Sequence, residues 1–258
     1  MSEDPVLIEV ADGVAVLTLN RPDRLNAWTQ ALENRYFDLL EQCGSDTDVR
    51  VVVVTGAGRG FCAGADMEDL QTIGDSGIDG ARARERRPQT LPLTIPKPII
   101  AAINGPCAGI GLVQALMCDI RFAAPGAKLT TAFARRGLIA EHGISWILPR
   151  LIGHARALDL LVSGRVFLAE EASELGVVNH LGNLDDALEY ARDMAANCSP
   201  ASMAVMKRQI YSHWDMTLDQ ALAESDGLML ESFTRPDFPE GVASFVERRE
   251  PHFAALSH

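Results

Sequence analysis

Two short apolar segments separated by a turn open the chain. Residues 6–10 and 14–19 are rich in valine and leucine, and the Ala-Asp-Gly sequence between them is typical of a tight turn. From residue 29 to residue 43 apolar side chains recur at helical spacing, at Leu32, Tyr36, Leu39 and Leu40. The pattern predicts a β-hairpin followed by an amphipathic helix.

Three further apolar runs lack the alternation of a half-exposed strand. Residues 49–54 are almost all valine, residues 99–103 are isoleucine and alanine only, and residues 120–124 continue this character. Unbroken runs of this kind are typical of parallel strands that are buried on both faces. A helix ending near Met117 is expected between the last two runs. The alternation of strand, turn and helix predicts an α/β layered fold.

The second half of the chain is mainly helical in character. Residues 153–198 are expected to be mostly helix, with breaks at Gly164 and Gly176. From Pro200 the pattern predicts one helix after another and no strand. We therefore place a boundary near residue 198, between a core of residues 1–198 and a helical region of residues 199–258.

Composition narrows the class of protein. The 258 residues include 47% hydrophobic and 22% charged ones, as in globular proteins, and 23 Lys and Arg against 35 Asp and Glu give a net charge of −12. An acidic chain argues against nucleic-acid binding, and an anionic small ligand would need local cations. We read no signal peptide and no apolar run long enough to span a membrane. The five widely spaced cysteines indicate a reducing, cytoplasmic location and no metal site.

A glycine-rich turn after the valine run permits a dinucleotide-binding interpretation. The segment VVVVTGAGRGF follows the order of strand and glycine turn in a Rossmann motif, and resembles the opening of short-chain dehydrogenases. However, the position of the third glycine is Cys62, and the segment does not lie on the first strand. No tyrosine has a lysine four residues later. Nicotinamide binding would be needed to support this alternative.

A second interpretation uses two glycine turns together. The segment FCAGADM closes the first turn, and NGPCAGIGL forms the second; each is a strand end that opens into a helix. Small residues let a ligand approach the backbone, and the free N–H groups of a helix start favour negative charge. Two adjacent turns would direct two N–H donors at one oxygen atom, which is the arrangement of an oxyanion hole.

The order of these and other motifs resembles the crotonase family, the enoyl-CoA hydratase/isomerase superfamily. The resemblance covers nearly the whole chain, from RLNA at residue 24 through MCDIRFA at residue 117 to FVERREPHF at residue 245. It implies an α/β fold with a crotonase-type ββα spiral core and a C-terminal helical oligomerisation region. It also implies a homotrimer or a dimer of trimers, an acyl-CoA thioester substrate, and no cofactor beyond the coenzyme A of that substrate.

The resemblance assigns roles to individual residues. The oxyanion donors fall on the N–H groups of Ala65 and Ile110. Asp66 is interpreted chiefly as the N-cap of the next helix. The residues expected to contact the acyl-CoA are Arg24, Leu25, Ala27, Ala63, Asp66, Met67, Gly109, Phe133, His142 and Trp146.

The acid–base group is where the sequence departs from the family's hydratases. Their two glutamates fall on Val113 and Phe133 here, so both carboxylates are missing. Glu141 lies where some isomerases of the family carry an acidic residue, and one carboxylate suffices for a 1,3-proton shift. We therefore expect enoyl-CoA isomerisation with Glu141 as the acid–base group. Enoyl-CoA hydration and a non-catalytic acyl-CoA-binding protein stay open as alternatives.

Coenzyme A is polyanionic, so cations are expected near its phosphates. Arg24 lies beside a segment whose backbone meets coenzyme A in the family. The run of Arg82, Arg84, Arg86 and Arg87 is a second candidate, with a solvated helix face as the alternative. Arg248 and Arg249 are candidates to reach a neighbouring subunit's coenzyme A.

Overall fold

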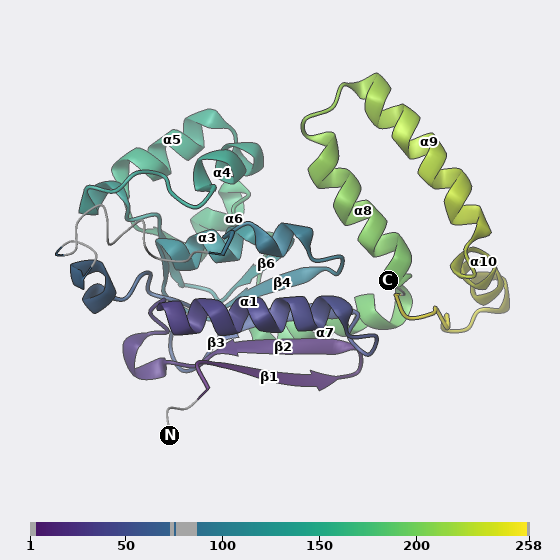
Figure 1. Ribbon diagram of the computed structural model, residues 1–258, viewed down its shortest axis with the longest axis horizontal. Helices are drawn as coiled ribbons and strands as arrows, with labels where there is room; N and C mark the ends of the chain where they lie inside the picture. The colour runs from purple at the N-terminus through teal and green to yellow at the C-terminus, as the bar shows by residue number, and fades with distance from the viewer. Residues whose placement is uncertain (1–3, 73–74, 76–86, 257–258) are drawn as a thin grey trace.

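A six-stranded sheet forms the centre of the protein. The computed structural model describes residues 4–72, 75 and 87–256. The strand order in the sheet is β1-β2-β3-β4-β6-β9 (Figure 1). The strands are β1 (Val6–Ala11), β2 (Val14–Leu19), β3 (Val51–Gly56), β4 (Ile99–Ile103), β6 (Ile120–Ala123) and β9 (His180–Leu181).

Pairing in this sheet agrees with the hydrophobic pattern. β1 and β2 form the antiparallel hairpin, and every other neighbouring pair is parallel. All residues of β3 and β4 are buried, which explains why neither sequence alternates. The predicted hairpin and the three predicted apolar strands are confirmed.

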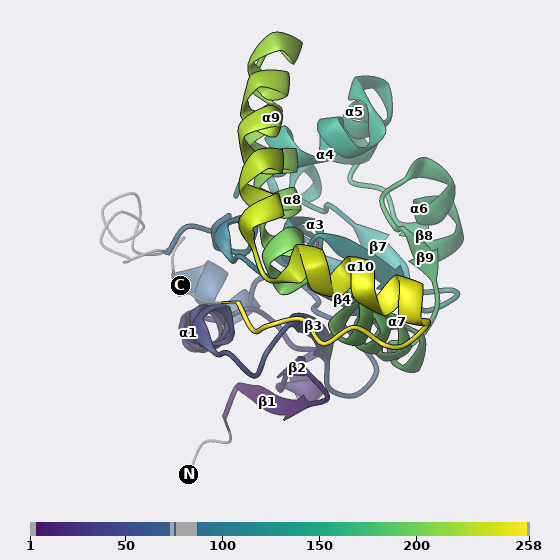
Figure 2. The same ribbon diagram turned by 90° about the vertical axis from the view of Figure 1, so that its right-hand side faces the viewer.

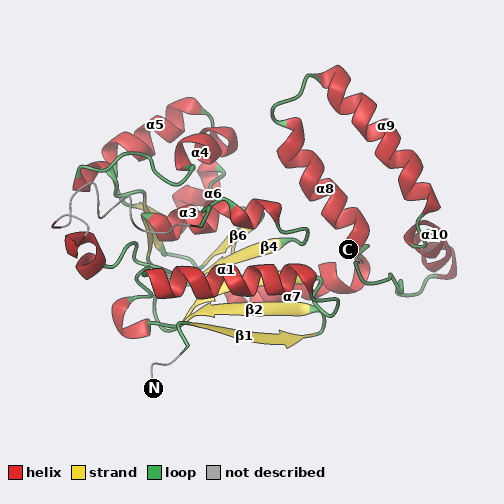
Figure 3. Cartoon of the chain, viewed as in Figure 1, coloured by secondary structure: helices red, strands yellow, loops and turns green. Residues whose placement is uncertain are grey.

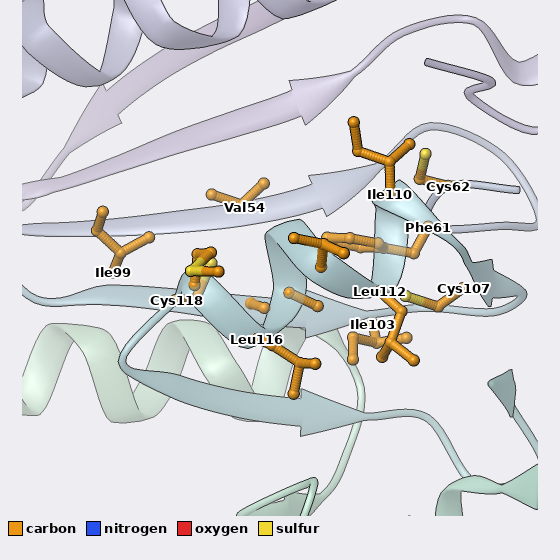
Figure 4. Close-up of a cluster of buried hydrophobic side chains, with 14 of the residues drawn as sticks. Val54, Phe61, Cys62, Ile99, Ile103, Cys107, Ile110, Leu112, Leu116 and Cys118 are labelled. Atoms are coloured by element: carbon orange, nitrogen blue, oxygen red, sulfur yellow. The ribbon is translucent and has the colours of Figure 1, made fainter. Parts of the chain in front are cut away.

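Helices cover both faces of the sheet. On one face α1 (Gln30–Ser45) and α3 (Ile110–Met117) pack against alternate residues of β3 and β4, such as Val54 and Ile99 (Figure 4). On the other face α7 (Leu184–Asn197) packs its alanines against the intervening strand residues. Figure 2 shows α1 and α7 on opposite sides of the strands. The layered α/β arrangement is confirmed.

A smaller sheet of three strands lies beside the first. It contains β5 (Cys107–Ala108), β7 (Lys128–Thr130) and β8 (Phe167–Leu168), in the order β5-β7-β8. The segment expected to be mostly helical does hold α5 (His154–Ser163), α6 (Ala169–Leu175) and α7, but also the short strands β8 and β9. These two-residue strands arise from pairing with β7 and β6, which no local pattern reveals.

The C-terminal region consists of helices, as predicted. It contains α8 (Pro200–His213), α9 (Leu218–Thr234) and α10 (Asp237–Glu247) (Figure 3). A further helix, α4 (Ile144–Ile152), precedes α5 in the chain. α8 is fixed to the body by Lys207, whose ammonium group lies 2.7 Å from the carboxylate of Asp119 and donates to the carbonyls of Pro92 and Lys97. α8 and α9 project from the sheet (Figure 1), and no residue of α9 is buried. None of the described helices could span a membrane.

Candidate active site

The two glycine turns lie against each other. Cys62 and Cys107 form a parallel β-bridge, and the N–H of Ala108 donates to the Cys62 carbonyl at 2.9 Å. Gly111, in the first turn of α3, approaches the same residue, because a Cβ atom at position 111 would lie 2.5 Å from the Cys62 carbonyl oxygen. Only glycine permits this approach, which brings the start of α3 onto the first turn.

Each turn contributes one residue, whose N–H group has no backbone acceptor among the described residues, to the wall of a shared cavity. Ala65 pairs with Trp28 in a bridge that uses the Gly64 carbonyl and the Asp66 N–H, so the Ala65 N–H stays outside the ladder. Ile110 is the first residue of α3, where an N–H has no partner within the helix. Within the described part of the chain neither N–H donates a hydrogen bond. Two such donors at one cavity are what an oxyanion hole requires.

The cavity has a volume of about 510 Å³, a size suited to a small organic group. Its wall includes both donor residues and most of the contact residues that the sequence predicts. Those contact residues are Arg24, Ala27, Ala63, Asp66, Met67, Gly109, Phe133 and His142, and the acid–base candidate Glu141 lines the same wall.

Two predicted contact residues lie elsewhere. The carbonyl of Leu25 accepts a hydrogen bond at 3.0 Å from Ala63, so Leu25 supports the cavity wall through its backbone. Trp146 packs edge-on against Trp214, with ring centroids 4.8 Å apart, and the Arg150 guanidinium lies 4.1 Å from its centroid. Neither side chain lines the cavity. Trp146 therefore joins α4 to the end of α8.

Glu141 and His142 stand together in the cavity wall, just before α4. The Nε2 atom of His142 lies 3.3 Å from a carboxylate oxygen of Glu141, and their side chains are 18% and 33% exposed, respectively. His142 has a left-handed backbone with φ of 59°, and so has Ala132, with φ of 57°, in the same wall. The carboxylate is thus partly shielded yet open to a ligand in the cavity.

Comparison with known proteins decides the family. The family model described as enoyl-CoA hydratase/isomerase matches residues 9–255. The chain belongs to this family. The predicted crotonase relationship and its fold are thereby confirmed.

Relatives within the family carry more than one activity in their names. The 1,2-epoxyphenylacetyl-CoA isomerase of Escherichia coli K12 is 37% identical over 96% of this chain and 97% of its own. An enoyl-CoA hydratase of Alternaria alternata is also 37% identical, over 96% of this chain and 85% of its own. Membership of the family therefore leaves the choice between isomerase and hydratase open.

Solved structures agree with the fold. A crystal structure of an enoyl-CoA hydratase from Polaromonas superposes with a TM-score of 0.91 at 29% identity, covering 96% of this chain and 99% of the other. One from Mycobacterium marinum is 53% identical, with a TM-score of 0.70, over 81% of this chain and 98% of the other. The fold of this family member is therefore that of the solved enoyl-CoA hydratase structures, and C-terminal helices are present.

Asp66 occupies the N-cap position that the sequence indicates for the next helix. Its side chain accepts a hydrogen bond at 3.1 Å from the Glu68 N–H, and its carbonyl accepts one from Leu70. Burial by itself raises the pKa of Asp66, but hydrogen bonds from Arg21, at 3.0 Å, and from Glu68 outweigh burial, so the pKa is lowered. An ionised carboxylate with two such partners holds the first turn in place.

The candidate cations for coenzyme A differ in their surroundings. Arg24 lies at the rim of the cavity, 3.2 Å from Glu68, with both side chains exposed. Arg87 faces away, toward Asp38 and Glu41 of α1. Arg82, Arg84 and Arg86 lie outside the described residues. Arg248 ends α10, and Arg249 binds Glu240 and Glu247 on the same surface. Arg136 lines the cavity and was not expected from the sequence.

Sequence reasoning also missed a polar part of the wall. Glu33, Trp28 and Gln89 line the cavity, and the indole of Trp28 and the amide of Gln89 both donate to Glu33, at 3.0 and 2.8 Å. The sequence does indicate a buried position for Glu33, because this residue lies one helical turn before the buried pair Tyr36 and Phe37. A charged residue on the buried face of a helix is uncommon unless it has partners or a function.

Proposed function

We propose that this family member isomerises the double bond of an enoyl-CoA thioester by proton transfer through one carboxylate, Glu141. The observation that carries the proposal is the cavity itself. Two N–H groups from paired turns, at Ala65 and Ile110, line the same cavity as a partly shielded glutamate. No cofactor beyond the coenzyme A of the substrate is needed for this chemistry.

The chemistry begins with the thioester carbonyl. When its oxygen accepts hydrogen bonds from Ala65 and Ile110, a proton on the carbon chain attached to the carbonyl becomes more acidic. The reason is that both donors stabilise the enolate that forms when this proton leaves. Each donor contributes about 3–4 kcal/mol to stabilising such a charge. Glu141 then removes a proton from one carbon and returns it to another, which moves the double bond. His142, 3.3 Å away, lies close enough to hydrogen-bond with the carboxylate in either state.

The preference for isomerisation rests on the two positions where the family's hydratases carry glutamates. Val113 is fully buried and Phe133 is 6% exposed, and neither can hold or deprotonate a water molecule. The relative from Escherichia coli is named as an isomerase of a CoA thioester, with an epoxide rather than an enoyl group as its named substrate. Hydration is the second candidate, because relatives named enoyl-CoA hydratases are as similar in sequence, at 37% identity, or more similar, at 53% identity over 81% of this chain.

The proposal is tested with a panel of 2- and 3-enoyl-CoA esters in deuterated water. We expect a moved double bond with deuterium incorporated, and loss of both in Glu141→Gln. Glu68→Gln, which removes another carboxylate at the cavity rim, serves as the matched control. Addition of one water would establish the hydratase instead. Exchange that persists in Glu141→Gln would refute the role of Glu141, and binding without any reaction would identify a non-catalytic acyl-CoA-binding protein.

We also propose assembly through the C-terminal helices, as a trimer or dimer of trimers in the cytoplasm. The support for assembly is the exposed apolar surface of α9 and α10, which includes Leu218, Leu230 and Phe245 at 74%, 62% and 85% exposure. The support for the location is that all five cysteines are free thiols. Sedimentation velocity tests the assembly, and a purely monomeric protein at micromolar concentration would refute it.

A further inference from the structure

Glu33 is a buried carboxylate that faces the cavity. The residue is 7% exposed and belongs to the wall that also holds Ala65 and Ile110. Its partners are neutral: Trp28 and Gln89 donate to Oε2 at 3.0 and 2.8 Å, and Gln30 donates to Oε1 at 3.4 Å. Among the described residues no cation lies within ion-pair distance of Glu33. The cavity wall thus contains a buried carboxylate without the cation that usually pairs with a buried negative charge.

One oxygen of this carboxylate retains capacity for another donor. Oε2 already accepts two short hydrogen bonds, whereas Oε1 has only the long contact from Gln30. A carboxylate offers about four lone-pair sites. A donor on a ligand in the cavity would therefore find an oriented acceptor at Oε1.

The surrounding side chains hold Glu33 in this orientation. The Oε1 atom of Gln89 accepts a hydrogen bond at 2.7 Å from Gln114, which is 2% exposed and belongs to α3. With its oxygen occupied in this way, Gln89 must turn its amide nitrogen toward Glu33. The carboxylate is consequently fixed from α1, α3 and the segment between them.

Trp28 connects this acceptor to the oxyanion donors. Its backbone forms the bridge with Ala65, and its indole donates to Glu33. The distance from Ala65 to the carboxylate is therefore at most one strand spacing, about 4.8 Å, plus the length of an indole side chain and the 3.0 Å hydrogen bond. An acyl chain held at the oxyanion donors is the part of the substrate that can reach across this distance.

We propose that Glu33 accepts a hydrogen bond from a hydroxyl group on the acyl chain, so that the substrates are hydroxylated acyl-CoA thioesters. This inference rests on the proposed acyl-CoA site, but it concerns binding and not the reaction. A hydroxyl is favoured over an ammonium group because it enters a buried wall without desolvating a second charge. An acyl chain without a donor would leave Oε1 dehydrated, with only the long contact from Gln30.

The test measures binding of saturated acyl-CoA esters, which cannot be isomerised or hydrated. Pairs of esters from four to ten carbons, each with and without a terminal hydroxyl, are titrated by calorimetry against the wild type, Glu33→Leu and the control Glu41→Leu. Glu41 is an exposed carboxylate on the same helix, outside the cavity. Circular dichroism establishes that each variant is folded.

At one chain length we expect the ester with the terminal hydroxyl to bind the wild type about 10- to 100-fold more tightly than the ester without it. This ratio corresponds to the free energy of one hydrogen bond to a charged group. Glu33→Leu should abolish or reverse this ratio, and Glu41→Leu should keep it. Equal binding at every length, or a preference that survives in Glu33→Leu, would overturn the inference and leave the isomerase proposal intact. Failure of all esters to bind would overturn both. If Glu33→Leu does not fold, Glu33→Gln replaces it and should reduce the ratio.

Discussion

Gly111→Ala is the sharpest test of how the two turns create the site. A Cβ atom at position 111 would lie 2.5 Å from the carbonyl oxygen, 2.6 Å from the Cβ and 2.8 Å from the Sγ of Cys62. Ordinary contact begins near 3.4 Å, so α3 and the first turn must separate by about 0.9 Å. Because one of the opposing atoms belongs to the backbone, a change of side-chain rotamer cannot relieve the contact.

Two consequences follow for Gly111→Ala. Overpacking of this kind destabilises a protein by about 1–3 kcal/mol, which lowers the melting temperature by roughly 2–4 °C for each kcal/mol in a chain of this size. The same movement carries the Ile110 N–H away from the position it shares with Ala65. Misplacement by about 1 Å, or loss of one oxyanion donor, lowers a rate by about 100-fold or more.

The assay should report on enolate formation alone. Exchange of the α-protons of a saturated acyl-CoA in deuterated water does so, and calorimetry separately measures binding of the ester. We expect exchange to fall by about 100-fold while the dissociation constant changes much less. Gly227→Ala is the control, since a Cβ there meets no atom within 4 Å. An unchanged melting temperature with unchanged exchange in Gly111→Ala would refute the reasoning.

Three further predictions concern the rest of the molecule. Lys207→Met removes a buried cation from the partly exposed carboxylate of Asp119 and should lower the free energy of unfolding by about 2 kcal/mol, measured in urea; a loss below about 0.5 kcal/mol would contradict this anchor for α8. Arg21 lowers the pKa of Asp66 in the folded protein, against the effect of burial. The ionised carboxylate therefore stabilises the fold at pH values above the pKa of Asp66 in the unfolded chain. This stabilisation is lost as the pH falls through the lowered pKa of the folded state. Arg21→Leu should therefore cost about 1–3 kcal/mol at pH 7 and less near pH 3, and an equal loss at both pH values would exclude the pairing as its cause. Only Cys198 is partly exposed among the five free thiols, and partial burial raises its pKa, so one thiol should react with an aromatic disulfide, slowly at pH 8 and faster at higher pH, and Cys198→Ser should abolish that fraction.

Where the sequence predicts the structure well, one local signal suffices. The valine run at β3 and the isoleucine–alanine run at β4 are each buried on both faces, so composition alone identifies them. The two glycine turns are also identified from the sequence, because a positive φ favours glycine and both Gly64 and Gly109 have a positive φ. The N-cap role of Asp66 follows from residue type and position alone.

Where prediction fails, the missing information is tertiary. Trp146 was expected to contact the acyl-CoA, but the face of α4 that carries it meets Trp214, at the end of α8. Arg87 was a candidate for phosphate binding, and instead two carboxylates of α1 surround it. Glu33 lies on the buried face of α1, but the orientation of its carboxylate depends on a hydrogen bond from Gln89, 56 residues away. Each outcome is decided by an element distant in sequence.

The left-handed backbone at Ala132 and His142 has a consequence for directed evolution. A residue with a Cβ atom is less stable in this conformation than glycine by about 1–2 kcal/mol, part of which glycine loses again through the entropy of the unfolded chain. Selection for thermostability alone should therefore enrich glycine at positions 132 and 142, at the edge of the cavity. Selection for turnover should retain the imidazole beside Glu141. At position 142, selection for stability and selection for activity should therefore favour different residues.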